Sequence, residues 1–318
     1  MKNKNILVTG GAGAIGANLV NILSASNKNI IVIDDLSSGT PENILKNKNV
    51  VLYKDSILND LLLKRIFLKS RNKIDIVFHL AALFANQNSV EHPEKDLLTN
   101  ALGTLKLLDL STKSRVERFV YISSSCVYGS AGVDLKEDLS FSLETPYAIS
   151  KFCGEQYAHF YHHLYGLRAV ILRYFNAFGP GDPPGRYRNV IPNFMLTALQ
   201  GKPLKITGTG DETRDFTYID DIIRGTILAA EVKNATGHIF NIGSGREIKI
   251  RHVAELINCL SGNKAGIKFI PRRKWDKITR RVANIEKSRK ILGYRPQISF
   301  DDGLKKTYRW FKERYCKK

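Results

Sequence analysis

The chain has 318 residues, 43% of them hydrophobic, which suffices for one large α/β unit and a smaller one. No run of about 18 apolar residues occurs, which excludes a membrane-spanning helix. The net charge is +19, from 49 Lys and Arg against 30 Asp and Glu, but the basic residues are scattered. We therefore expect no membrane and no nucleic acid among the partners.

Short apolar runs alternate with amphipathic stretches over the first half of the chain, as in βαβ units on a parallel sheet. The run at residues 6–8 is too short for a signal peptide and is interpreted as the first strand. Further strands are predicted at 30–33, 50–53, 74–79, 119–123 and 169–174, with helices at about 15–24, 59–69, 93–113 and 146–165. The predicted fold class is α/β, a Rossmann-type doubly wound parallel sheet.

After residue 173 the alternation is interrupted by a Gly- and Pro-rich loop at 179–185. Beyond it the sequence predicts strands at 204–207, 239–242 and 268–270 and helices near 190–200, 219–231 and 251–260. We interpret residues 1–175 as a cofactor-binding domain and 176–318 as a smaller α/β substrate domain, with a segment near 217–242 returning to the first. Ligands of open α/β sheets bind in the crevice at the carboxyl ends of the strands.

A glycine-rich turn follows the first predicted strand. Gly10, Gly13 and Gly16 are spaced for a tight turn and a close helix–strand contact, so that free N–H groups at the helix start can bind a pyrophosphate. The next strand ends at Asp34, whose carboxylate can accept hydrogen bonds from ribose hydroxyls and repels a 2′-phosphate. The sequence therefore predicts NAD as the cofactor. Asp55, after the third strand, is a candidate for the adenine end or a plain capping residue.

A phenol and an ammonium group lie one helical turn apart at Tyr147 and Lys151. Ser124 ends the fifth predicted strand, where side chains face the crevice. A nearby ammonium lowers the pKa of a phenol, and we expect Tyr147 to take a proton from a sugar hydroxyl while hydride leaves for the nicotinamide.

With these parts in order, the chain resembles the extended short-chain dehydrogenases/reductases, specifically the NAD-dependent nucleotide-sugar epimerases and dehydratases. Besides the glycine turn, the resemblance is carried by His79-Leu80-Ala81-Ala82, by Arg173-Tyr174-Phe175-Asn176 and by Arg214-Asp215-Phe216. It covers nearly the whole chain and implies that Ser124, Tyr147 and Lys151 form the catalytic triad.

The resemblance also implies two sets of binding residues. Cofactor contacts are expected at Gly10, Gly13, Ala14, Ile15, Gly16, Asp34, Asp35, Ser38, Gly39, Asp55, Ser56, Leu80, Ala81, Ala82, Asn100, Tyr147, Lys151 and Tyr174. Substrate contacts are expected at Ser125, Asn176, Asn189, Val190, Arg214, Arg273 and Asp276. Arginine suits a nucleotide diphosphate because its planar fork matches phosphate oxygens. The predicted partners are a nucleotide-sugar, with a UDP-sugar first, and a second copy of the chain in a homodimer through a four-helix bundle.

The residues after Ser124 help to choose the reaction. Family 4,6-dehydratases typically carry an acidic residue there, whereas this chain has Ser125 and Cys126, which disfavours water elimination and, more weakly, decarboxylation. Enzymes of the family that epimerise C3 and C5 carry a cysteine at the position of Cys126 and pair it with a second acid/base. Here Asn189 takes the partner's place, with Arg188 and Lys205 nearby.

The leading hypothesis is therefore C4 epimerisation of a UDP-hexose, with NAD oxidising C4 and returning the hydride to the opposite face. Epimerisation at C3 or C5 by Cys126 is the alternative reaction. A hypothesis from a different functional class is a non-catalytic NAD-binding protein. Phe84 stands where some 4-epimerases have a lysine, and Arg280 or Arg281 falls near the position that limits substituent size on the sugar. An arginine there either meets a carboxylate or lies in solvent.

The cysteines and histidines of the chain predict no metal site. The four cysteines, Cys126, Cys153, Cys259 and Cys316, lie far apart, and neither they nor the seven histidines show metal-ligand spacing. Unpaired cysteines are typical of a reducing compartment, so we expect a cytoplasmic protein.

Overall fold

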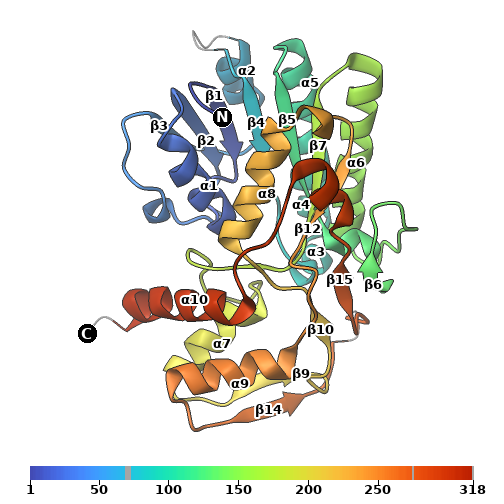
Figure 1. The fold of residues 1–318 in the computed structure, drawn as a ribbon. Helices are drawn as coiled ribbons and strands as arrows, with labels where there is room; N and C mark the ends of the chain where they lie inside the picture. Colours follow the sequence, from blue (N-terminus) through green and yellow to red (C-terminus); the bar gives the residue numbers. More distant parts are fainter. Residues whose placement is uncertain (69–72, 274–275, 317–318) are drawn as a thin grey trace.

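The protein is described by a computed structural model covering residues 1–68, 73–273 and 276–316, so the predicted helix end at residue 69 lies outside the described residues. A seven-stranded parallel sheet, with strand order β12-β7-β5-β4-β1-β2-β3, forms its centre (Figure 1). The strands are β1 (Asn5–Thr9), β2 (Asn29–Asp34), β3 (Val50–Lys54), β4 (Ile76–His79), β5 (Arg118–Ser124), β7 (Ala169–Tyr174) and β12 (Ile239–Ile242). The prediction of a Rossmann-type parallel sheet is confirmed.

Alternating side chains of the strands enter two separate cores, because successive residues of a strand point to opposite faces. Ile6 and Val8 of β1 pack in one core and Leu7 in the other. The first face is covered by α1 (Ala14–Ser24) and α8 (Ile219–Glu231), and the second by α2 (Asp60–Leu68), α5 (Gly103–Lys113) and α6 (Pro146–Tyr165). Helices on both faces explain why these strands read as continuous apolar runs.

The predicted helix at 93–113 has three parts. It begins as α4 (Pro93–Asp96), widens into a π-helix η2 (Leu97–Leu102) and continues as α5. Such π segments are rare in proteins overall, and those that occur often lie at functional sites. This one contains Asn100, whose side chain is hydrogen-bonded to Leu83 and to Ser150 of α6.

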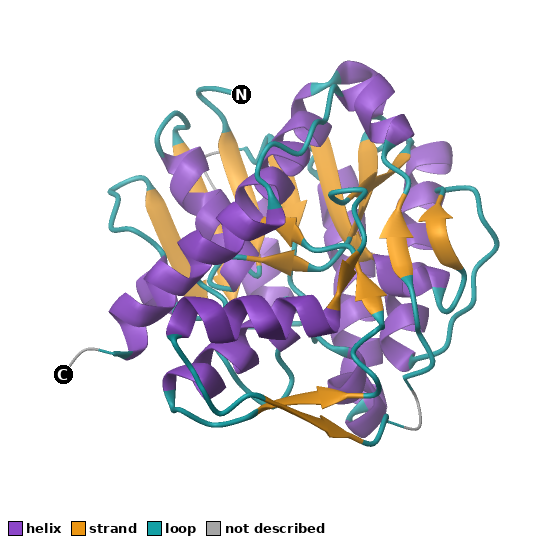
Figure 2. Cartoon of the chain, turned by 60° about the horizontal axis from the view of Figure 1, so that its bottom comes forward, coloured by secondary structure: helices purple, strands orange, loops and turns teal. Residues whose placement is uncertain are grey.

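A second layer lies beyond the carboxyl ends of the sheet strands (Figures 1 and 2). Its parallel pair β9 (Leu204–Thr207) and β14 (Ile267–Ile270) packs with α7 (Val190–Leu199) and α9 (Ile250–Ser261). The amphipathic helix α10 (Phe300–Tyr315), which the sequence reading did not predict, packs on α7 and α9. β12 pairs with β7 and thereby brings the chain back to the main sheet.

Short elements connect the layers. They comprise the paired strands β6 (Gly132–Leu135) with β15 (Arg281–Ala283), β8 (Ala177–Phe178) with β11 (Thr217–Tyr218) and β10 (Thr213–Arg214) with β13 (Ile248–Lys249), together with α3 (Asn86–Glu91), η1 (Pro41–Asn43), η3 (Ser125–Tyr128), η4 (Lys233–Ala235) and η5 (Ser288–Leu292). The β6–β15 pair ties the segment before α6 to the C-terminal part, which places Arg281 near Cys126. No helix within the described ranges is long and apolar enough to cross a membrane.

Candidate active site

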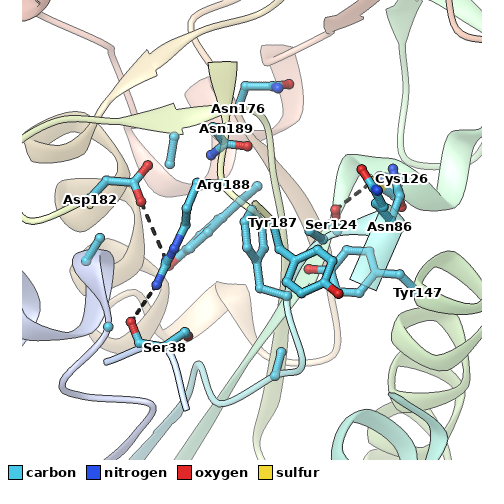
Figure 3. Close-up of a pocket in the computed structure, with 18 of the residues that line it drawn as sticks. Ser38, Asn86, Ser124, Cys126, Tyr147, Asn176, Asp182, Tyr187, Arg188 and Asn189 are labelled. Atoms are coloured by element: carbon cyan, nitrogen blue, oxygen red, sulfur yellow. Dashed lines mark hydrogen bonds and ion pairs between the residues drawn. The ribbon is translucent and has the colours of Figure 1, made fainter. Parts of the chain in front are cut away.

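A cavity of about 650 Å³ opens between the carboxyl ends of the sheet strands and the second layer. Figure 3 shows part of its wall, with Ser124, Cys126 and Tyr147 on one side and Asp182 and Arg188 on the other. Nearly all predicted site residues line this cavity. The exceptions are Gly39 and Asn100.

Two glycines of the turn, Gly10 and Gly16, leave no room for a side chain. Gly10 has a φ of +69°, and a Cβ there would lie 2.7 Å from the backbone nitrogen of Ala81. A Cβ on Gly16 would collide with the carbonyl oxygen of Gly10, whereas one on Gly13 would come no closer than 3.3 Å to that oxygen. Gly13 precedes α1 without a side-chain cap, so the N–H groups of the first turn remain available to an anionic ligand.

Asp34 ends β2 beside this turn. Its carboxylate accepts hydrogen bonds from the backbone N–H groups of Ala12 (2.8 Å) and Leu36 (2.9 Å), and burial raises its pKa. Gly39 lies behind the carboxylate, where a Cβ would be 2.8 Å from its Oδ1 atom, which explains why Gly39 supports the site without lining it. Asp55 accepts hydrogen bonds from the Ser56 N–H and the Asn59 side-chain amide and lines the cavity, whereas the Leu62 N–H in the first turn of α2 is capped by Asn59.

The predicted catalytic side chains come from β5 and α6. The Ser124 hydroxyl accepts a hydrogen bond from the Cys126 N–H at 3.2 Å and is also hydrogen-bonded to Tyr147. Thr145 caps α6 by accepting a hydrogen bond from the Ala148 N–H. Phe84 meets the Tyr147 ring edge-on at a centroid distance of 6.4 Å. Ser124 and Tyr147 therefore present two hydroxyls together at the cavity wall.

Lys151 lies one turn along α6, fully buried, with its ammonium nitrogen 4.5 Å from the centre of the Tyr121 ring. Burial lowers the pKa of Lys151 to about 7, against the opposing effect of Asp96 and Glu155. The expectation that Lys151 depresses the pKa of Tyr147 is not met. Burial raises the pKa of Tyr147, and the hydrogen bond with Ser124 opposes this effect.

Asn100 is placed behind the site rather than in it. Its side-chain oxygen accepts the Leu83 N–H at 2.7 Å, and its amide donates to Asp96 and Ser150. It is completely buried. Asn100 therefore positions the Leu83 segment against α6, and the resemblance alone did not distinguish this position from direct cofactor contact.

The far end of the cavity is rich in arginine. Arg214 of β10 lies 3.7 Å from Asp276, and Arg272, which the sequence reading missed, also faces that carboxylate at 3.9 Å. Burial, followed by repulsion from Arg281, lowers the pKa of Arg214 to about 10. Arg273 lines the same end. Asn176, Asn189, Val190 and Ser125 also line the cavity.

Arg280 and Arg281 have opposite environments. Arg280 is exposed on the outside and makes a bidentate ion pair with Glu247, at 2.5 and 2.6 Å. Arg281 is 4% exposed and lines the cavity. Of the two arginines that the sequence left open, only Arg281 faces the site. Trp275, upstream of both, lies outside the described residues.

A loop between β8 and α7 crosses the cavity edge. Arg188 donates to the Ser38 carbonyl oxygen at 2.6 Å and pairs with Asp182 at 3.6 Å (Figure 3). Arg186 and Tyr187 both contact Glu91. Arg188 therefore points to the cofactor end and away from Cys126 (Figure 3). Sequence reasoning offered no signal for the contacts with Ser38 and Glu91, because they join segments 150 and about 95 residues apart.

Comparison with known proteins decides the family. The model of the NAD dependent epimerase/dehydratase family matches residues 6–243. The chain belongs to this family. NAD is thus the cofactor, as predicted, and the glycine turn and Asp34 fit it.

Individual relatives agree with this assignment. A UDP-glucuronate 4-epimerase of Thermodesulfobacterium geofontis is 37% identical, over 96% of both chains. An epimerase structure from Methanothermobacter thermautotrophicus is 49% identical, with a TM-score of 0.96, covering 99% of this chain and 94% of that one. A UDP-glucose 4-epimerase of Thermotoga maritima, solved with UDP-glucose, is 35% identical, with a TM-score of 0.92 and coverages of 98% and 99%.

Proposed function

We propose that the protein epimerises a UDP-linked hexose at C4. The observation that carries this proposal is the joint placement of Ser124, Tyr147 and Lys151 on the wall of a cavity whose other end holds several arginines. The residues after Ser124 bring no carboxylate, which family dehydratases need there for proton transfer. Relatives that carry the names UDP-glucuronate 4-epimerase and UDP-glucose 4-epimerase support both the reaction and the nucleotide.

The cofactor site is assigned to the glycine turn, the strand ends and Lys151. The N–H groups at the start of α1 hold the pyrophosphate, and Asp34 accepts hydrogen bonds from the adenosine ribose. The other predicted cofactor residues that line the cavity complete the contact set. NAD bound there supplies reversible hydride acceptance at C4 of the sugar.

Protein side chains carry out the proton transfer. Tyr147 takes the proton of the C4 hydroxyl and returns it when the opposite epimer forms, and Ser124 shares that hydrogen bond. The buried Tyr147 has a raised pKa as described above, so its ionisation needs additional positive charge at the site. The oxidised nicotinamide ring would supply such charge when NAD is bound.

The remaining assignments concern the substrate and the assembly. Arg214 and Arg273 bind the diphosphate, with Asn176, Asn189, Val190, Ser125 and Asp276 completing the substrate contacts. Residues 1–175 act as the cofactor domain, and 176–318 as the substrate domain with its segment near 217–242 on the main sheet. The four cysteines, all free thiols, fit a cytoplasmic location.

A homodimer through α5, α6 and their partner copies is the proposed assembly. The outward face of α6 carries Ile149, Phe160 and Leu164, each 49–60% exposed, at spacings that put them on one stripe. Leu98 and Leu102 of the neighbouring η2 segment are also exposed. Contiguous apolar patches of this kind mark interaction sites.

The test is proton NMR of the NAD-loaded protein in D₂O with UDP-glucose, UDP-N-acetylglucosamine, UDP-glucuronate and GDP-mannose in separate tubes. Inversion at C4 with retention of the original hydrogen is the expected result for a UDP-sugar. Deuterium at C3 or C5 would instead assign the chemistry to Cys126. No change in any sugar would overturn the proposed reaction.

A further inference from the structure

Arg281 is a buried cation without a counter-ion in the described part of the chain. Its Nη2 atom donates to the Gly129 carbonyl oxygen at 3.0 Å, and its Nη1 atom contacts the Cys126 sulfur at 3.6 Å. The Nε atom is buried without a hydrogen-bond partner among the described residues. Neither contact places a carboxylate oxygen next to the Arg281 guanidinium.

The other arginines at this end differ in this respect. Arg214 and Arg272 share the Asp276 carboxylate, and Arg280 pairs with Glu247. A buried guanidinium with no anion is costly, because the desolvation of its charge is not compensated. The cavity that Arg281 lines therefore lacks one negative group, which a ligand has to supply.

Arg281 lies next to both Arg214 and Cys126, between the proposed diphosphate residues and the predicted catalytic side chains. Its guanidinium contacts the sulfur of Cys126, and the Cys126 N–H donates to Ser124, whose hydroxyl is hydrogen-bonded to Tyr147. In the proposed reaction Ser124 and Tyr147 hold the C4 hydroxyl, so Arg281 faces the substituents of the sugar ring next to C4. The planar fork of arginine matches a carboxylate in two-point contact.

We propose that Arg281 binds a carboxylate carried by the sugar, and that the substrate is a UDP-linked uronic acid. This inference rests on the proposed function for the orientation of the sugar. It makes Arg281 a specificity-determining residue, since a neutral hydroxymethyl group leaves the guanidinium without its counter-ion.

The test is a calorimetric comparison of UDP, UDP-glucose and UDP-glucuronate on the NAD-loaded protein, without turnover as the readout. We expect UDP-glucuronate to bind at least about tenfold more tightly than UDP-glucose. The variant Arg281→Met is expected to abolish that ratio. The matched control Arg280→Met removes the neighbouring exposed arginine and is expected to preserve it.

Two outcomes overturn the inference. One is equal affinity of the unmodified protein for the two UDP-sugars, a comparison that needs no variant. The other is a loss in Arg281→Met that is as large for UDP alone, which assigns Arg281 to the diphosphate or to packing. A protein that prefers the uronate but epimerises nothing contradicts the proposed reaction alone, whereas one that epimerises UDP-sugars without preference contradicts this inference alone.

Discussion

The two ends of the cavity are lined by different parts of the chain, one mainly by backbone and the other mainly by side chains. The proposed cofactor end consists mainly of backbone, with the glycine turn, the start of α1 and the tip of β2 all within residues 10–39. The substrate end consists of long side chains from β10, residues 272–273 and β15, which meet only after folding. Local spacing therefore specifies the first end, and tertiary structure specifies the second.

The largest effect is expected where the two ends meet, at Tyr147. Removing its hydroxyl in Tyr147→Phe should lower kcat by about 10²–10⁴-fold, the usual contribution of a general acid/base. Bound NAD and the unfolding temperature should stay unchanged, because the ring still packs against Phe84. Steady-state kinetics and absorbance of the bound cofactor measure both. Tyr165→Phe, at the exposed end of the same helix, is the control, and similar losses in the two variants would remove Tyr147 from the chemistry.

The glycine turn allows a prediction about how much room the backbone leaves for a methyl group at Gly16 and at Gly13. Gly16→Ala places its methyl group against the Gly10 carbonyl oxygen and should destabilise the fold by about 1–3 kcal/mol, with loss of NAD. Gly13→Ala keeps 3.3 Å to the same oxygen and should lose NAD while the apoprotein unfolds at nearly the same denaturant concentration. Urea unfolding with and without NAD separates the two effects. Equal stability of both variants would contradict the assignment of Gly16 to helix–strand contact.

The same contrast explains what the sequence could predict. The glycine turn, Asp34 and the Tyr147/Lys151 pair follow from spacing along one strand or helix, and the structure brings them to one cavity. The orphaned guanidinium of Arg281 could not be predicted, because its environment depends on the pairing of β15 with β6, about 150 residues earlier. Helix α10 was missed although its sequence is amphipathic, and the raised pKa of Tyr147 depends on burial that no local pattern reports.

The outer face of the cofactor half allows a test of assembly. Phe160→Glu with Leu164→Glu puts two charges into the stripe on α6 and should convert a homodimer into a monomer of about half the mass. Leu61→Glu is the control, because Leu61 is 81% exposed on α2, outside the proposed interface. Light scattering of the three proteins gives the answer. A monomeric unmodified protein would rule out the four-helix bundle.

A smaller effect is expected at the seam between the halves, where Asp182 pairs with Arg188. Burial raises the pKa of Asp182 from 3.8 to about 6, so the folded protein favours the protonated form. This stabilising contribution is present below pH 4 and is lost as pH rises through about 6, at a cost of at most about 3 kcal/mol.

The variant Asp182→Asn removes that titration. It should therefore be more stable than the unmodified protein at pH 7.5 and equally stable near pH 4. Urea unfolding at both pH values measures the difference. Greater stability of the unmodified protein at pH 7.5 would mean that the ion pair with Arg188 outweighs the burial of the carboxylate.

The smallest effect is expected at Cys126, which connects the catalytic end to the substrate end. Cys126→Ser keeps an acceptor for Arg281 but removes the thiol, so C4 epimerisation should stay within about threefold of the unmodified rate, far from the 10²–10⁴-fold expected of an acid/base. Arg188, one candidate partner for a C3/C5 mechanism, is held at the cofactor end by Ser38 and Asp182. Lys205 of β9, the other candidate, lines the cavity, and only without such a partner is the thiol limited to proton exchange on one face. If Cys126→Ser abolishes turnover and deuterium uptake together, the thiol is the catalytic base and the simple hydride-return scheme fails. If turnover persists without deuterium uptake, Cys126 is not the catalytic base.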